Sequence, residues 1–226
     1  MTRVAVFLFL LILPVAARSS SPYPERAVIG NVISSDRDPS VRIALPESAA
    51  YVGTDKWVLF GIANCQLFVF VDADEQKSVQ RLYWVQFEGY IPSMPKLHHT
   101  YDSKEHATLG GMDFFVDTWV QDGKASKPDT KPLADFIKAK GYAVPAGINS
   151  GSDEEHIYAL IASKGYKLPP ALRAVRLVHT LDDQRKELMI IYSEAARSKQ
   201  TLTNEERRAL VARAENSVEV APWQHR

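Results

Sequence analysis

The stretch Val79–Tyr90, VQRLYWVQFEGY, decides the fold prediction for this chain. One set of alternate positions is apolar and contains Tyr83, Val85 and Phe87, whereas the other set mixes aromatic with polar residues. Alternation with a period of two residues is typical of a strand that has one face on a core. The stretch therefore predicts a long strand, with the apolar set directed into the protein.

Further strands are expected on both sides of this segment. They are Met112–Gln121 (MDFFVDTWVQ), two strands within Lys56–Val71 that turn near Ala63, and a hairpin formed by Leu172–Thr180 and Glu187–Ser193. The last of these segments is apolar on both faces, which is typical of a strand in the centre of a sheet that is covered on both sides. Consecutive strands joined by short polar connections predict an antiparallel sheet.

Three helices are predicted: Lys131–Gly141, Ser152–Gly165 and one that begins at Thr203. Ser152 and Thr203 each precede a Glu by three residues. This spacing forms a capping box, in which the two side chains bond each other's free backbone N–H groups. Strands, two helices, two strands and a helix, in that order, predict an α+β fold. We expect one mainly antiparallel sheet packed against about three helices, in a single domain over residues 51–226.

The first 50 residues differ from the rest. Residues 1–17 have a basic Arg3, an apolar run and small residues before a cut after Ala17, which is the composition of a secretory signal peptide. A transmembrane helix needs about 20 apolar residues, and this run is shorter, so membrane attachment is expected only through an uncleaved signal. Residues 18–50 are rich in Ser, Pro and charge, and we interpret them as a flexible lead-in with one short strand near Val41–Leu45.

Composition narrows the class of protein. Lys plus Arg and Asp plus Glu both number 27, so the formal net charge is zero and the basic surface of a nucleic-acid binder is not expected. Cys65 is the only cysteine, and the chain has no N-x-[ST] glycosylation motif. An exported eukaryotic protein of this size often has disulfides and such motifs. We therefore expect export to a bacterial periplasm or the extracellular space, without an intramolecular disulfide.

The mixed faces of two predicted strands are the first candidate site. Trp84 and Glu88 share one face, and Asp117 and Trp119 share a face of the other strand. Apolar walls with a few placed polar groups are typical of a concave ligand site. The alternative is a solvated outer face that carries a cross-strand aromatic pair.

A long loop, Ile91–Gly111, is the second candidate, because it contains His98, His99 and His106 among carboxylates. Imidazole and carboxylate groups suit Zn²⁺, but adjacent residues in an extended segment point in opposite directions, so we predict no metal site and no cofactor. The three histidines are instead assigned to ligand binding. Cys65 alternates with apolar residues and is expected to pack in the core rather than react.

Three classes of function remain open. The first is an exported binding or accessory protein that holds a small molecule or a peptide on the aromatic and acidic face. The second is an interaction or structural protein that acts through exposed aromatic side chains. The third is an enzyme that combines strand carboxylates with the His98–His106 loop in acid–base chemistry. No motif identifies a catalytic residue, and the sequence does not specify the ligand or the oligomeric state.

Overall fold

The computed structural model describes residues 24–223, and within them strands dominate. Seven strands form one antiparallel sheet in the order β4-β5-β6-β10-β9-β8-β7. Their bounds are β4 Ala50–Leu59, β5 Ala63–Ala73, β6 Val79–Tyr90, β7 Glu105–Leu109, β8 Met112–Asp122, β9 Ala171–Leu181 and β10 Lys186–Ala196. As expected from its two apolar faces, β10 occupies the centre of this sheet.

A second, smaller sheet joins both ends of the described chain. It is antiparallel, in the order β1-β2-β3-β11, with β1 Arg26–Ile29, β2 Val32–Ser35, β3 Val41–Ala44 and β11 Glu219–Pro222. The expected fold of one sheet against about three helices is therefore wrong, because the chain forms two sheets and is 44% strand and 19% helix. The segment interpreted as a lead-in, from residue 24 onward, supplies three of the four strands.

The error has a local and a long-range cause. The strands in residues 24–50 are only four residues long, and Ser, Pro and charged residues surround them, which resembles the composition of a loop. Ile33, Val41 and Ile43 are nevertheless fully buried. β3 pairs with β11, from the other end of the chain, and that partner cannot be found from local sequence. The expected signal peptide, residues 1–17, lies outside the described residues.

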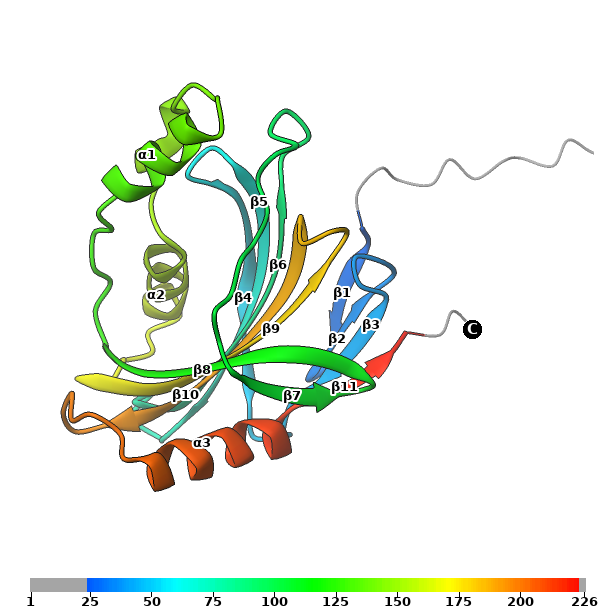
Figure 1. Ribbon diagram of the computed structural model, residues 1–226. Coiled ribbons are helices and arrows are strands. Elements are labelled where there is room, and N and C mark those ends of the chain that lie inside the picture. Colours follow the sequence, from blue (N-terminus) through cyan, green and yellow to red (C-terminus); the bar gives the residue numbers. More distant parts are fainter. Residues whose placement is uncertain (1–23, 224–226) are drawn as a thin grey trace, which may run out of the picture.

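Helices cover opposite faces of the large sheet. A long excursion between β8 and β9 carries α1 Lys131–Ala139, the short 3₁₀ helix η1 Ala146–Asn149 and α2 Asp153–Ser163, and α3 Asn204–Ser217 follows β10. Figure 1 shows the large sheet curving beside α2, with the small sheet on its other side and α3 along its lower end. Both predicted capping boxes are present, at Ser152 and at Thr203.

The large sheet consequently has two buried faces, here called the apolar face and the α2 face. On the apolar face, side chains such as Phe70, Val85 and Ile190 pack against the small sheet and α3. On the α2 face, side chains such as Trp84 and Ile191 pack against Ile157, Tyr158 and Ile161 of α2. From the sequence, one face of β6 could be either a ligand site or a solvated outer surface. In the structure, α2 covers most of that face.

The loop expected over residues 91–111 is shorter than predicted, because β7 begins at Glu105 and forms a hairpin with β8. Gly110 and Gly111 make the turn with φ of +59° and +80°, a backbone region that glycine enters at little cost. A Cβ atom at Gly110 would lie 2.4 Å from the carbonyl oxygen of Val220 in β11. The hairpin therefore also contacts the small sheet, which explains glycine at this position.

Candidate functional site

Strand register brings two carboxyl groups together on the α2 face. β6 and β10 pair so that Glu88 lies directly opposite Glu187, and β5 pairs with β6 so that Cys65 lies opposite Glu88. Directly opposite residues project to the same face of a sheet with Cβ atoms about 5 Å apart. Glu187 is only 3% exposed, and Glu88 is partly buried. Two acidic side chains are thus held next to each other away from bulk water.

Asp153, the first residue of α2, adds a third carboxyl group. Burial and the neighbouring acidic groups raise the pKa of Glu88 well above its usual value. Burial raises the pKa of Glu187 to about 7 and that of Asp153 to about 6. Burial disfavours the charged form of an acid, and like charges add to the effect. The three groups therefore share protons near neutral pH.

His99 completes the group from the loop after β6. Its Nδ1 lies 3.0 Å from Oε2 of Glu187, and its ring stacks on Tyr90 with centroids 4.5 Å apart. Burial lowers the pKa of His99 to about 4, so the imidazole is neutral at pH 7. At pH 7 the contact between His99 and Glu187 is therefore a hydrogen-bond contact of a neutral imidazole rather than an ion pair.

Two buried polar atoms in this region have no hydrogen-bond partner: Nε2 of His99 and Oδ1 of Asp153. Leaving a buried donor or acceptor unsatisfied costs about 1–3 kcal/mol. Most buried polar groups in native proteins are paired, so an unpaired one requires an explanation. Here both belong to residues around the same two carboxyl groups, Glu88 and Glu187.

Neighbouring side chains orient these carboxyl groups. The Tyr101 hydroxyl donates to Oε2 of Glu187 at 2.5 Å. Trp84 Nε1 donates to Oε1 of Gln86 at 2.9 Å, and Gln86 Nε2 donates to Oε2 of Glu88 at 3.1 Å. We call Glu88, His99, Tyr101, Asp153 and Glu187 the acidic cluster. Its members come from β6, the loop after β6, α2 and β10, so the cluster exists only in the folded chain.

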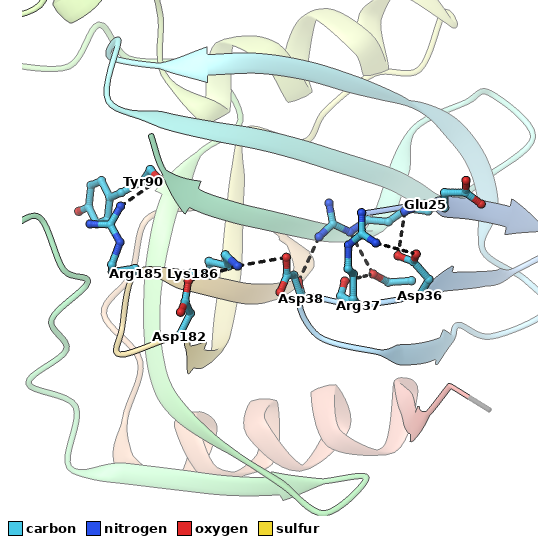
Figure 2. Close-up of polar contacts among 10 residues, drawn as sticks. Glu25, Asp36, Arg37, Asp38, Tyr90, Asp182, Arg185 and Lys186 are labelled. Carbon is cyan, nitrogen blue, oxygen red and sulfur yellow. Dashed lines mark hydrogen bonds and ion pairs between the residues drawn. The ribbon is translucent and has the colours of Figure 1, made fainter. Parts of the chain in front are cut away.

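The loop that carries His99 is fastened to the β9–β10 hairpin by Arg185. One guanidinium nitrogen donates to the carbonyls of Met94 and Leu97 at 2.9 and 3.2 Å, and the other to those of Tyr90 and Ile91 at 3.3 Å each. Figure 2 shows the Arg185–Tyr90 contact beside Lys186, which pairs with two aspartates. The backbone N–H of His99 also donates to Gln184 at 2.7 Å. The position of His99 is therefore defined by the hairpin.

A cleft of about 1210 Å³ lies next to the end of β6 that carries the cluster. Its walls come from β1, β2 and β4–β6, and Cys65, Glu88 and Tyr90 are among the lining residues. On its far side Arg26 lies over the Phe87 ring, 4.0 Å from the centroid. Because β1 and β2 form part of its wall, the cleft lies partly on the small-sheet side of the large sheet, and Glu88 is the one member of the acidic cluster among its lining residues.

The residues assigned to ligand binding from sequence are Trp84, Glu88, His98, His99, His106, Asp117 and Trp119, and they fall into three groups. Glu88 and His99 lie in the cluster, and Trp84 reaches it through Gln86.

Asp117 is linked to the cluster through Arg176. It pairs with Arg176 at 2.5 Å, and the Arg176 guanidinium lies 5.1 Å from the centroid of the Tyr101 ring. Trp119 shares the face, but β9 and β10 separate its strand from that of Trp84, so the two do not form a pair.

His98 and His106 lie outside the cluster. His98 Nδ1 contacts the carbonyl oxygen of Asp183 at 2.8 Å, and His106 pairs with Asp113 at 3.0 Å on the surface. As expected for neighbours in an extended segment, His98 and His99 take different directions. Cys65 is buried as predicted, although its thiol donates to Oε2 of Glu88 at 3.4 Å. Burial raises the pKa of this thiol, which disfavours the reactive thiolate.

Sequence reasoning missed three members of the cluster, Tyr101, Asp153 and Glu187. Glu187 begins an apolar strand segment and resembles a charge at the strand end, and Asp153 is indistinguishable from the acidic residues that favour a helix start. Only the β6–β10 register places Glu187 against Glu88. No pattern within either strand contains that information.

The remaining evidence on function is negative. Within residues 24–223, no helix combines the length and the apolar character that a membrane crossing requires. No protein-family model matches the chain, and neither a curated protein nor a solved structure matches it.

Proposed function

We propose that this protein binds a small ligand through the acidic cluster on the α2 face. The observation that carries the proposal is the pair of unpartnered buried atoms, His99 Nε2 and Asp153 Oδ1, around carboxyl groups that burial destabilises as anions. A purely structural core would be more stable with apolar side chains at these positions. Groups with strongly shifted pKa values in a partly accessible place are candidates for a functional site.

The location of the cluster supports binding rather than pure packing. Glu88, Tyr101 and Asp153 each retain partial exposure, so the cluster is not sealed. The cleft that Glu88 lines offers space at one edge of the cluster, and Trp57 and Tyr90 supply apolar surface there. Concave sites that combine apolar walls with few polar groups are typical of small-molecule binding.

An acid–base enzyme is the second candidate, and one observation favours it. The neutral imidazole of His99 lies 3.0 Å from Glu187, and burial raises the pKa of Glu187 to about 7. A general acid or base works best when its pKa is near the operating pH. An interaction protein has less support, because the large hydrophobic side chains exposed in the described residues are few and lie on three elements: Ile29, Tyr51, Val58 and Phe136.

The proposal also includes export, as the composition of residues 1–17 suggests. Expression of the full chain in a bacterium, followed by mass spectrometry of the periplasmic and secreted fractions, tests this part. We expect a product that begins at Arg18. A full-length product confined to the cytoplasm would contradict it.

Thermal unfolding and tryptophan emission of the purified protein, measured against a panel of metal salts, small organic acids, amines and short peptides, test the binding function. A ligand at 100 times its Kd should stabilise the fold by about 2.7 kcal/mol. It should also shift the emission of Trp84, which is linked to Glu88 through Gln86.

The matched control for this screen is a pair of Glu→Gln substitutions. We expect Glu88→Gln to remove the ligand effect, and Glu105→Gln, at an exposed position on β7, to retain it. A ligand whose effect survives in Glu88→Gln, or a panel without any stabilising compound, would overturn the proposal.

A further inference from the structure

Three side chains of the acidic cluster meet the geometric requirement for a metal centre. One ligand atom each from Glu88, His99 and Glu187 lies within 4.8 Å of the others. Within residues 24–223 this is the single group of three or more His, Cys, Asp or Glu side chains that does so. Bonds of about 2.0–2.2 Å from nitrogen or oxygen to Zn²⁺ place two ligands of one ion up to about 4 Å apart. Adjustments of about an ångström would complete the coordination.

Their hydrogen bonds leave suitable atoms available. In the described part of the chain, Glu88 and Glu187 accept hydrogen bonds only through Oε2, so Oε1 of each remains for an ion. His99 is 8% exposed, directs Nδ1 at Glu187, and has no hydrogen-bond partner at Nε2. A buried imidazole nitrogen without a hydrogen-bond partner, Nε2 of His99, is the observation, independent of the carboxyl groups, that points to a ligand.

Charge favours a dication at this position. Strand register holds Glu88 directly opposite Glu187, and Asp153 of α2 interacts electrostatically with both. Neighbouring like charges in a buried place repel each other strongly because the local dielectric is low. A bound divalent cation would turn this repulsion into attraction.

The surrounding residues have the form of an outer ligand shell. Gln86 and Cys65 donate to Glu88, and Tyr101 donates to Glu187. The loop that carries His99 is fixed through Arg185, as Figure 2 shows for its contact with Tyr90. Such partners orient metal ligands, and their loss typically weakens metal affinity about 10–100-fold. The donors come from elements that are already rigid, which favours a preformed site.

We infer that Glu88, His99 and Glu187 bind one divalent first-row transition-metal ion. One nitrogen with two carboxylate oxygens suits Zn²⁺ or Mn²⁺, whereas Ca²⁺ and Mg²⁺ prefer sites made of oxygen alone. This inference rests on the proposed function, because it names the ligand class of the same site.

Isothermal titration calorimetry of the EDTA-treated and dialysed full-length protein with ZnCl₂, MnCl₂ and CaCl₂ tests it, with bound metal counted by mass spectrometry. We expect one Zn²⁺ or Mn²⁺ per chain and much weaker Ca²⁺ binding. Glu187→Gln and His99→Ala should each reduce the affinity at least 100-fold. Co²⁺ should give a visible absorption band with the parent protein that is lost in His99→Ala.

His106→Ala is the matched control, because His106 also lies 3.0 Å from a carboxylate, Asp113, but outside any group of three ligands. It should bind metal like the parent protein. Circular dichroism in EDTA verifies that each variant is folded. If a variant does not fold, Asp153→Asn is measured in its place, and it should weaken metal binding about 10-fold.

Absence of metal binding by the parent protein, or equal loss in His106→Ala, would overturn the inference. If an organic ligand then still stabilises the parent protein but not Glu88→Gln, the metal inference fails and the proposed function stands. If neither metals nor organic compounds bind, both fail.

Discussion

The two faces of the large sheet are both buried, yet they are built differently. The apolar face packs mainly hydrophobic side chains against the small sheet and α3, and its polar groups, such as Gln66 and Glu194, are hydrogen-bonded to Arg26 and Arg213. The α2 face is hydrophobic around Ile157 and Ile161 but carries the acidic cluster where β6 meets the loop of His99. Both faces therefore contribute hydrophobic burial, but only the α2 face holds carboxyl groups against one another beside the unpartnered atoms His99 Nε2 and Asp153 Oδ1. That difference is the main structural argument for a site.

Two consecutive isoleucines of β10 compare the faces directly. Ile190 lies on the apolar face and is fully buried, and Ile191 lies on the α2 face with 3% exposure. Ile→Ala in a core costs about 2–5 kcal/mol. We expect Ile190→Ala near the upper end of this range, because two sheets enclose the side chain and cannot close the cavity.

Ile191→Ala should lie near the lower end, because a single helix can move towards the sheet. Urea unfolding of both variants measures the difference. A larger loss for Ile191→Ala would mean that the α2 face, despite its polar cluster, is the main stabilising core.

The second comparison concerns how the free energy of unfolding depends on pH in the parent protein and in a variant of each face. Between about pH 4.5 and 7 the unfolded chain has released the Glu187 proton, while the folded chain, with its pKa of about 7, retains it. The free energy of unfolding therefore falls as pH rises. Asp153 and Glu88 act in the same direction, and His99, with its pKa lowered to about 4, acts in the opposite one.

Three carboxyl groups outweigh one imidazole, so the metal-free protein should be less stable at pH 8 than at pH 5 by about 1–3 kcal/mol. Denaturant unfolding in EDTA at several pH values measures this trend. Glu88→Gln should reduce the slope, whereas Ile190→Ala should shift the whole curve without changing its shape. Constant or rising stability over this range would show that the cluster is not buried as described.

The smallest expected effect is the loss of stability when one of the two capping boxes is removed. Both boxes form the same hydrogen bonds, but their helices lie on opposite faces of the large sheet. Ser152 caps α2 and Thr203 caps α3, each accepting from the backbone N–H of a Glu three residues later. Replacing either by Ala should cost about 1 kcal/mol. Only Ser152→Ala should also change the emission of Trp84, because the first turn of α2 carries Asp153.

Unfolding and fluorescence measurements on the two variants test this point. An emission change in Thr203→Ala but not in Ser152→Ala would contradict the assignment of α2 to the cluster.

Local signals predicted much of the chain. The strands β6, β8, β9 and β10 and the helices α1, α2 and α3 follow from periodicity, capping boxes and glycines past helix ends. Gly141 and Gly165 have φ of +85° and +77°, as the expected helix stops require. Of the small sheet only β3 was expected, near Val41–Leu45; the sheet itself could not be predicted, because its strands are short and one of them, β11, comes from the distant end of the chain.

The candidate site divides in the same way. Sequence alone determined that Trp84 and Glu88 share one strand face, that His99 points away from His98, and that Cys65 is buried. Only the tertiary structure decided that this strand face is covered by α2 and that Glu187 and Asp153 join Glu88 there. The physical reason is that alternation and helix capping depend on neighbours along the chain. Strand register and helix docking depend on contacts between residues far apart in the chain, such as Glu88 with Glu187 and Val41 with Pro222.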